Sequence, residues 1–360
     1  MSDKKSPTEL IHEKKVLCLF NRVREGSLER IAKGNESDNA YFGMLRLKHF
    51  GYSAEYLEIE QFFSPGACRF LRKYVLNIHF AHAPLFRKIL SYDIVFTSTA
   101  FGTFLLWVLY PFKKPKWVMF DFNLLGIIGD KKTLKQKIFS FLVSRSSGIV
   151  TISREGAEEI KKAFPKLKDK TQFIPLGTDT VWFAPQNIQE EDLIFSPGRD
   201  PGRDYKTFFE AVRDLSVSVI ITARPQKLKK YSLPEKVKTS DLTAKEMVEM
   251  YAKAKIVVLP LHISDEYYNA MGCSTLVEAM AMGKAVIATR SATMESYIRD
   301  GENGILVPQN DAIALRNAIN ELLSDSDKRK RLGENVRKFA VEYCEAEKFA
   351  KNLTDFFEKI

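Results

Sequence analysis

Two successive sets of short apolar runs, each alternating with longer amphipathic runs, constrain the fold of this chain most strongly. In the first set, strands are predicted at residues 16–20, 54–59, 94–98, 117–120, 148–152 and 172–174. Helices are predicted between them, near residues 38–50, 68–80, 101–110, 134–146 and 153–164. This alternation is typical of an α/β domain built on a parallel sheet.

The alternation is interrupted by PLGTDTVWFAP at residues 175–185, where two prolines and a glycine predict a linker. A second set follows, with strands predicted at residues 193–196, 218–222, 256–259, 285–288 and 305–307. Its helices are predicted near residues 205–214, 243–253, 275–282, 312–324 and 328–360. The 360 residues suffice for two domains. We expect a first domain over residues 1–175, a linker over 176–190 and a second domain over 191–340. We expect a final helix over residues 341–360, and one hypothesis is that it crosses back to the first domain.

Two βαβ domains joined by a linker imply a cleft between them, the usual place for a ligand. Several strong motifs of other chemistries are absent: GxGxxG after the first strand, GxxxxGK[ST], HExxH and GxSxG. The four cysteines are scattered and form no CxxC pair, which favours a reducing compartment. We therefore expect no metal site and no resident cofactor.

The block GCSTLVEAMAMGKAVIAT, residues 272–289, predicts a glycine turn, a helix that opens near Ser274 or Thr275, and a buried strand. The open N–H groups at such a helix start form a natural diphosphate site, and Gly272 allows close approach to the backbone. Glu278 lies one turn into the helix, where its carboxylate can accept hydrogen bonds from two ribose hydroxyls. The competing interpretation is a capping box of Thr275 and Glu278, which needs no ligand.

The block SPGRDPGRDYKTFFEA, residues 196–211, directly follows the first strand of the second domain. Its glycines and proline form a tight loop that presents Arg199 and Arg203 at the end of that strand. Two guanidinium groups there can clamp a pyrophosphate through bidentate hydrogen bonds. The alternative is a solvated turn in which Asp200 and Asp204 neutralise both arginines.

These two blocks, together with YIRDGENGILV at residues 297–307, resemble the donor domain of the retaining glycosyltransferases of family 4. IVTIS (149–153) and FIPLGTD (173–179) are similar to that family's last N-domain strand and linker. The similarities run in the family's order from about residue 148 to 308, whereas residues 1–147 agree only in pattern. The resemblance implies the α/β GT-B fold, in which two Rossmann-like domains face a central cleft and C-terminal helices follow.

The resemblance also implies roles for single residues. Arg199 and Arg203 fall where the family stabilises the donor diphosphate and the charge of the departing phosphate. Glu278 falls on the second glutamate of a paired-glutamate motif and would bind the ribose. The other implied donor-binding positions are Gly198, Leu242 near the base, and Gly272, Cys273, Ser274, Thr275 and Leu276 at the phosphates.

Two positions depart from the family's pattern. Ala270 stands eight residues before Glu278, where the family often has its first glutamate, and Asp265, Glu266 and Asn269 are the candidates to replace that carboxylate. The family's N-domain histidine has no counterpart in WVMFDFN at residues 117–123, where Asp121 occupies the neighbourhood. We therefore consider Asp121 and Asn269 as contacts for the sugar or the acceptor.

The net charge of +10 lies entirely in the first half of the chain. Residues 1–180 carry 29 Lys and Arg against 18 Asp and Glu, whereas residues 181–360 carry 26 against 27. CRFLRKYVLNIHF, at residues 68–80, places Arg69, Arg72 and Lys73 beside an apolar helix face, and KQKIFSFLVSR at residues 135–145 has a similar character. Such helices can lie on anionic bilayers. The alternative is ordinary packing on the sheet.

The uncharged residues 94–112 are long enough for a spanning helix, but their β-branched first part and Leu/Trp-rich second part favour a buried strand followed by a packed helix. The favoured hypothesis is a cytoplasmic GT-B glycosyltransferase, peripheral on the inner face of the membrane. It would move a sugar, with retention and without a metal, from a UDP- or GDP-sugar to a lipid-linked or saccharide acceptor of the cell envelope. One alternative is an inactive GT-B nucleotide-binding protein. The other, a basic nucleic-acid-binding protein, is not expected because no nucleic-acid module accompanies the charge.

Overall fold

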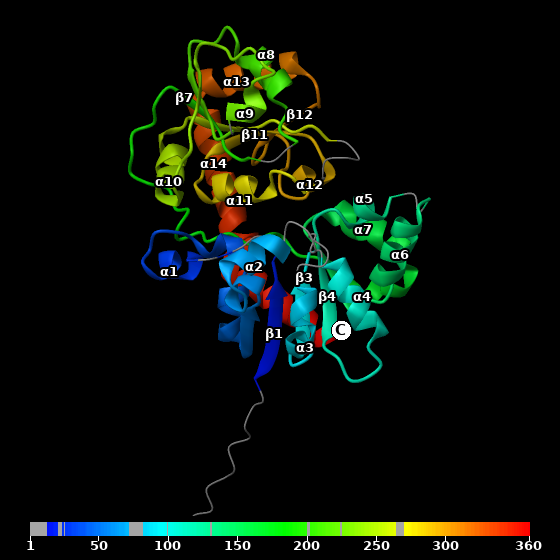
Figure 1. Ribbon diagram of the computed structural model, residues 1–360. Coiled ribbons are helices and arrows are strands. Elements are labelled where there is room, and N and C mark those ends of the chain that lie inside the picture. The colour runs from blue at the N-terminus through cyan, green and yellow to red at the C-terminus, as the bar shows by residue number, and fades with distance from the viewer. Residues whose placement is uncertain are drawn as a thin grey trace, which may run out of the picture.

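The described strands form two six-stranded parallel sheets, one in each half of the chain (Figure 1). The computed structural model describes residues 13–20, 24, 26–71, 82–98, 100–129, 132–199, 202–223, 225–263 and 270–360. Helices cover both sheets, and the sheets belong to two bodies joined at the linker. The expected α/β architecture of two Rossmann-like domains is confirmed.

The first sheet has the strand order β2-β1-β3-β4-β5-β6. Its strands are β1 (Lys14–Leu19), β2 (Tyr52–Tyr56), β3 (Ile94–Thr97), β4 (Lys116–Asp121), β5 (Gly148–Thr151) and β6 (Thr171–Phe173). The α-helices of this half are α1 (Ser27–Ala32), α2 (Pro65–Phe70), α3 (Phe86–Ile89), α4 (Phe101–Leu109), α5 (Leu124–Ile128), α6 (Leu134–Val143) and α7 (Arg154–Ala163). Short 3-10 helices are η1 (Asp38–Tyr41), η2 (Met44–Phe50), η3 (Ile59–Gln61), η5 (Ala83–Leu85) and η6 (Pro165–Lys170).

The second sheet has the strand order β12-β11-β10-β7-β8-β9. Its strands are β7 (Leu193–Ser196), β8 (Ser218–Ile221), β9 (Val237–Thr239), β10 (Ile256–Leu259), β11 (Ala285–Thr289) and β12 (Ile305–Val307). Its helices are α8 (Tyr205–Val212), α9 (Pro225–Leu228), α10 (Ala244–Lys253), α11 (Cys273–Ala281), α12 (Ala292–Glu295), α13 (Ala312–Ser324) and α14 (Ser326–Tyr343), and α15 (Ala346–Lys359) follows. The central strands β10 and β11 are buried along their whole length, as expected for a sheet covered on both faces.

Two local features differ from the predictions, and one further prediction lies only partly within the described residues. The single helix predicted over residues 38–50 is two 3-10 helices, because Phe42 (φ 49°) and Gly43 (φ 73°) both adopt left-handed backbone conformations between them. Strand β9 was not predicted. The helix predicted over residues 68–80 is described only to Leu71, and the rest lies outside the described residues.

The uncharged residues 94–112 form strand β3 and helix α4, as their composition indicates. Among the described residues, every helix is too short or too polar to cross a bilayer.

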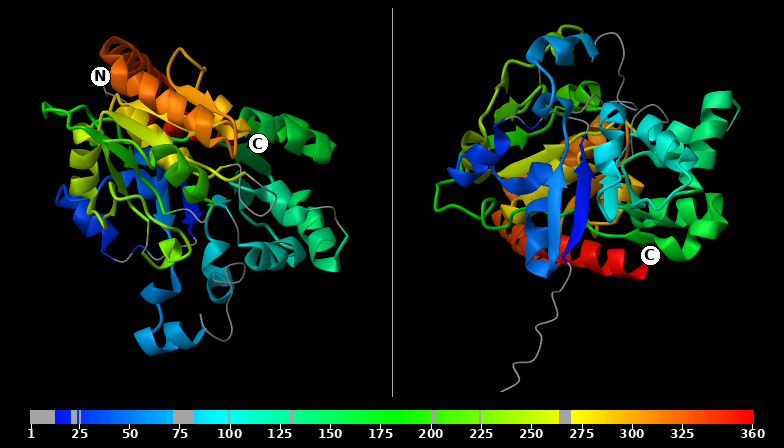
Figure 2. Two further views of the ribbon diagram at one scale, coloured as in Figure 1. Left: turned by 90° about the horizontal axis from the view of Figure 1, so that it is seen from above. Right: turned by 60° about the horizontal axis from the view of Figure 1, so that its bottom comes forward.

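The last helix, α15, packs on the sheet of the first domain (Figure 2, right). The Phe357 ring lies 6.0 Å from the Tyr52 ring and 6.1 Å from the Phe96 ring, centroid to centroid. The chain crosses back where the Thr178 N–H donates to the Cys344 carbonyl (2.7 Å) and the Ala346 N–H donates to the Thr178 carbonyl (2.9 Å). The first domain is therefore assembled from both ends of the chain.

A buried tyrosine of the second domain ties the two bodies together next to the linker. The Tyr297 hydroxyl accepts a hydrogen bond from the Leu176 N–H (2.8 Å) and donates to the Ile152 carbonyl (3.0 Å). Beside it, the Arg154 N–H donates to Ser296 Oγ (3.0 Å). These bonds hold the end of β5 and the start of α7 against the residues that follow α12 in the second domain.

Candidate functional site

The loop after β7 depends on Gly198. Its φ of 107° favours glycine, and its N–H donates to Thr222 Oγ1 at 2.7 Å. A Cβ at this position would lie 2.0 Å from Arg203 Nη2. A glycine at this position therefore permits the turn and also leaves room for the Arg203 guanidinium.

Arg203 joins this loop to the start of α11. Arg203 is only 4% exposed, and its Nη2 lies 3.0 Å from Thr275 Oγ1. The backbone around it is fixed by two hydrogen bonds, from the His262 N–H to the Gly202 carbonyl (2.8 Å) and from the Asp204 N–H to the Pro260 carbonyl (3.0 Å). A guanidinium held in this way is preorganised for an anion at the helix start.

Arg199 occupies the exposed side of the same loop. Its guanidinium is paired with Asp241, and the neighbouring Leu242 is half-buried against the core of the second domain. Asp204 does not neutralise an arginine as the alternative interpretation held; its carboxylate accepts the Thr207 N–H (3.1 Å) and caps α8. Asp200 lies outside the described residues.

Helix α11 begins earlier than predicted. Its N-cap is Gly272, with φ 77°, and the Leu276 N–H closes the first turn on the Gly272 carbonyl at 2.8 Å. Thr275 Oγ1 donates to the same carbonyl (2.9 Å) while it accepts from Arg203. The Cys273 N–H donates to the Ala270 carbonyl at 3.4 Å, so the amides of Ser274 and Thr275 form the open turn, and the amide of Leu276 is used within the helix.

The capping-box interpretation of Thr275 and Glu278 is wrong, because these residues are the third and sixth of the helix rather than its cap. Glu278 instead accepts a hydrogen bond from the Tyr251 hydroxyl at 3.1 Å and from Asn39 Nδ2 at 3.4 Å. Burial, reinforced by the Glu278 charge, raises the pKa of Tyr251 well above its ordinary value, so the hydroxyl keeps its proton and remains a donor. Hydrogen bonds from side chains of both domains therefore fix the orientation of the Glu278 carboxylate.

Asn39 connects this carboxylate to the linker. Its Nδ2 also donates to Thr178 Oγ1 (2.9 Å), and its Oδ1 accepts the Asp179 N–H (2.7 Å). Nearby, Arg46 forms ion pairs with Asp38 (2.8 Å) and Asp179 (3.1 Å). The first domain therefore contacts the predicted nucleotide site through the segment that joins the domains.

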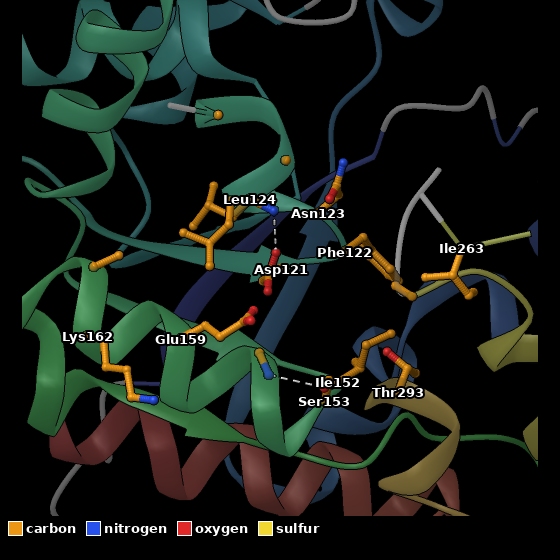
Figure 3. Close-up of a pocket in the computed structure, with 16 residues that line it drawn as sticks. Asp121, Phe122, Asn123, Leu124, Ile152, Ser153, Glu159, Lys162, Ile263 and Thr293 are labelled. Carbon is orange, nitrogen blue, oxygen red and sulfur yellow. Dashed lines mark hydrogen bonds between the residues drawn. The ribbon is translucent and has the colours of Figure 1, made fainter. Parts of the chain in front are cut away.

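A cavity of about 940 Å³ lies between the carboxyl ends of the two sheets (Figure 3). The first domain lines most of it, including Asp121 at the end of β4 and Glu159 of α7. The second domain contributes Ile263, Ala270 and Thr293. Asp121 and Ala270 thus line one cavity, although they come from different domains. Asp265, Glu266 and Asn269 lie outside the described residues.

The surroundings of Asp121 disfavour the ionised form of its carboxyl group. Burial raises the pKa of Asp121 to about 6, and the Glu159 charge adds to this, although hydrogen bonds from the Leu124 and Asn123 N–H groups oppose it. The Leu124 N–H lies 2.6 Å from Asp121 Oδ1, and the Glu159 carboxylate points toward Asp121 (Figure 3). A carboxylate with this pKa can change its protonation near neutral pH.

The site joins residues that the sequence predicted with residues that it did not. Gly198, Arg203, Gly272, Thr275 and Glu278 come together, and Arg199 and Leu242 border them on the exposed side. Cys273 is 1% exposed and burial raises the pKa of its thiol to about 12, so its side chain belongs to the core. Ser274 is exposed in the first turn of α11.

Asn39, Tyr251 and Glu159 were not predicted as parts of the site. Only the placement of η1, α10 and α7 in space brings them to it. Within the part of the chain that the structure describes, no three His, Cys, Asp or Glu side chains are grouped so as to hold a metal ion.

Two facing Rossmann-like domains, with a loop arginine and a helix N-terminus at one side of the cleft, define the class of the fold: it is GT-B. The chain aligns with a solved structure of HepE from Anabaena in complex with UDP and glucose, with a TM-score of 0.67 and 15% identity over 96% of this chain and all of the other. It aligns with sucrose-phosphate synthase from Thermosynechococcus elongatus with a TM-score of 0.70 and 18% identity, over 96% and 98% of the two chains. The fold prediction is confirmed.

Residues 222–339 match the protein family described as "Glycosyl transferases group 1". Among curated proteins, the MMP alpha-(1->4)-mannosyltransferase of Mycolicibacterium hassiacum is 24% identical over 226 residues, which cover 59% of this chain and 54% of that protein. The chain therefore matches only about half the length of that relative. The family match lies in the second domain, where the sequence motifs of the predicted donor site also lie.

Proposed function

We propose that this protein is a glycosyltransferase that uses a nucleotide-sugar donor and retains the configuration of the anomeric carbon. One observation carries the proposal: the buried guanidinium of Arg203 meets the open first turn of α11 at Thr275, and Glu278 lies one turn further along the same helix. The first two features suit a diphosphate, and the third suits a ribose. The family match and the shared fold support this reading.

In the proposed reaction, the bond between the anomeric carbon and the diphosphate oxygen breaks, and the acceptor oxygen forms a bond to the same carbon. The acceptor releases its proton, and a nucleoside diphosphate leaves. Negative charge grows on the departing phosphate, and the guanidinium groups of Arg203 and Arg199 with the amides of α11 would stabilise it without a metal. A UDP- or GDP-sugar is the proposed donor.

The cavity beside Asp121 is the proposed place for the transferred sugar and the acceptor, which we take to be a lipid-linked or free saccharide. Carboxylates accept hydrogen bonds from sugar hydroxyls, and both Asp121 and Glu159 face this space. We also propose that the protein works as a peripheral protein on the cytoplasmic face of a membrane. The one-sided charge of the first half supports this, and Arg69, with Phe70 58% exposed beside it, lies at the end of α2. Arg72 and Lys73 belong to the same basic stretch and lie outside the described residues.

A panel of UDP-, GDP- and ADP-sugars tests the proposal. Unfolding of the purified protein is followed with each donor, because a ligand present at 100 times its dissociation constant adds about 2.7 kcal/mol to the free energy of unfolding. Release of the nucleoside diphosphate and transfer of the sugar are then measured with the donor that stabilises most. Stabilisation without hydrolysis or transfer would favour the inactive nucleotide-binding protein. Ala270 is the residue that supports this alternative, because it lacks the carboxylate that would bind the sugar.

Asp121 gives the reaction a predicted dependence on pH. If the ionised carboxylate orients the acceptor hydroxyl, activity with acceptor should fall as the pH decreases through about 6, where Asp121 takes up a proton. Asp121→Asn should lower activity at neutral pH by about tenfold or more and remove this acidic limb. Glu159→Gln removes a negative neighbour and should therefore move the limb to lower pH. The pH profile of kcat/KM measures both effects, and an Asp121→Asn enzyme with the wild-type profile would exclude this role.

A further inference from the structure

Helix α6 packs on the first domain through one apolar face. Phe139, Leu142 and Val143 are buried, and the Phe139 ring stacks on Phe101 of α4 with the ring centroids 4.4 Å apart. This contact aligns α4 and α6 on the same flank of the first sheet, where both are seen in Figures 1 and 2. One such face is sufficient to hold an amphipathic helix on a sheet.

Helix α6 also has a second apolar face, which is exposed. Leu134, Ile138 and Phe141 follow one another at helical spacing and are 75%, 39% and 47% exposed. The neighbouring end of α4 continues this character, with Leu109 69% and Phe112 70% exposed. Single exposed apolar residues are ordinary, but an apolar stripe along one exposed helix face, such as that of α6, marks an interaction site.

Basic side chains border these residues. Lys113, Lys135, Lys137 and Arg145 are all exposed, and the Arg145 guanidinium lies 5.0 Å from the centre of the Phe141 ring. Residues 94–154 contain nine Lys and Arg but only two acids. One of these acids, Asp121, lines the cavity between the domains, and the other, Asp130, lies outside the described residues.

The two helices present their basic groups close together. Burial, and next the positive charge of Arg145, lower the pKa of Lys114, which follows α4. The loop after α4 and the end of α6 are therefore near enough for their like charges to interact. We call this surface, from Leu109 to Lys114 and from Leu134 to Arg145, the α4–α6 face.

We infer that the α4–α6 face binds an anionic lipid bilayer, with its leucine and phenylalanine side chains inserted and its lysine and arginine side chains at the headgroups. Exposed apolar groups flanked by basic residues match the two parts of such an interface. A symmetric dimer through this face would oppose like charges, which disfavours a second copy as the occupant. A nucleic acid would leave the leucines without an apolar partner. The bilayer satisfies both kinds of side chain.

The position of this face suits a lipid-linked acceptor, and in this respect the inference rests on the proposed function. Gly126 and Gly129, in and after α5, line the cavity between the domains, and α5 packs on α6. One short helix therefore separates the cavity from the α4–α6 face. An acceptor anchored in the bilayer would have its sugar close to Asp121.

Vesicle sedimentation of the full chain tests the inference without donor or acceptor, so its result does not depend on catalysis. Wild-type protein is mixed with phosphatidylcholine vesicles and with vesicles that also contain phosphatidylglycerol, at low and high salt. One variant carries Lys135→Glu, Lys137→Glu and Arg145→Glu, and a second carries Leu134→Ser, Ile138→Ser and Phe141→Ser. The matched controls carry Lys229→Glu, Lys245→Glu and Lys338→Glu, or Val181→Ser and Ile313→Ser, which are exposed positions outside this face.

We expect wild-type protein to bind the anionic vesicles, less at high salt, and to bind the neutral vesicles weakly. Each basic residue near the surface adds roughly fivefold to partitioning, so the charge variant should lose on the order of a hundredfold. The serine variant should lose at least tenfold, and both controls should bind as wild type does. Thermal unfolding, with and without the nucleotide, checks that each variant is folded and still binds its donor.

Three results would overturn the inference: no binding to anionic vesicles, unchanged binding of both α6 variants, or an equal loss in the controls. A further arm reverses Arg69, Arg72 and Lys73 to Glu. If that variant alone is released from the vesicles, the membrane surface is the basic stretch at residues 68–80 rather than the α4–α6 face. Failure of sugar transfer, with vesicle binding intact, would count against the proposed function alone.

Discussion

Arg203→Ala should lower turnover by about 10²-fold or more, which corresponds to about 2.7 kcal/mol of lost transition-state stabilisation. The reason is geometric: the guanidinium is 4% exposed and is fixed at Thr275, so no water can easily replace it at the departing phosphate. Arg199→Ala should have an effect of the same order, since this residue supplies the second positive charge. Steady-state kinetics, with the donor that the nucleotide-sugar panel selects, measures both effects.

Controls separate this effect from a general loss of folding. Arg203→Lys keeps the charge but not the planar fork, so its turnover should fall between those of the wild type and the alanine variant. Arg213→Ala removes an exposed arginine at the end of α8 and should leave turnover unchanged. EDTA should have no effect on the wild type. Full activity in both alanine variants, or complete loss in EDTA, would contradict the proposed site.

Glu278→Gln should weaken nucleotide binding by about 1–3 kcal/mol, or roughly 5- to 150-fold, the range for a lost hydrogen bond to a charged group. The substitution keeps the shape of the side chain, and its amide oxygen can still accept the Tyr251 hydroxyl. The fold should therefore persist while the charge that attracts the ribose hydroxyls is lost. Isothermal titration with the nucleoside diphosphate measures the change.

The chain provides a matched control for this variant. Thr243 and Glu246 form a true capping box at the start of α10: each side chain accepts a hydrogen bond from the other's backbone N–H. Glu246→Gln should at most lower the melting temperature slightly and leave nucleotide affinity unchanged. If Glu278→Gln behaves like Glu246→Gln, with a lower melting temperature and intact affinity, the ribose assignment is wrong.

The strands were predictable because a buried parallel strand is a short, continuous apolar run between turn signals. The runs at β10 and β11 illustrate this, since every residue in them is buried. Strand β9 escaped prediction because it is only three residues long and its second and third residues are exposed. A short edge strand buries too little to leave a periodic signal.

Residues of the candidate site were likewise predictable only where a local sequence motif contains them. Gly198, Arg203 and Glu278 could be proposed from the sequence because they lie in local motifs that begin at a strand end or a helix start. Asn39 and Tyr251 contact Glu278 from 239 and 27 positions away, and neither lies in a recognisable motif. The start of α11 was misplaced because Thr275 and Glu278 have the spacing of a capping box, whereas the left-handed Gly272 ends the turn before them.

The return of α15 to the first domain has a consequence for biosynthesis. Phe349, Phe356 and Phe357 are almost completely buried, and Phe357 packs on Phe96 of β3. A ribosome makes the six strands of this sheet before residue 174 and the aromatic residues that cover one side of it only after residue 348. During the synthesis of the intervening residues, at about 5–20 per second, that side of the sheet has no α15 to cover it. The second domain can fold as soon as it emerges, so the first domain to be translated would be the last to be completed.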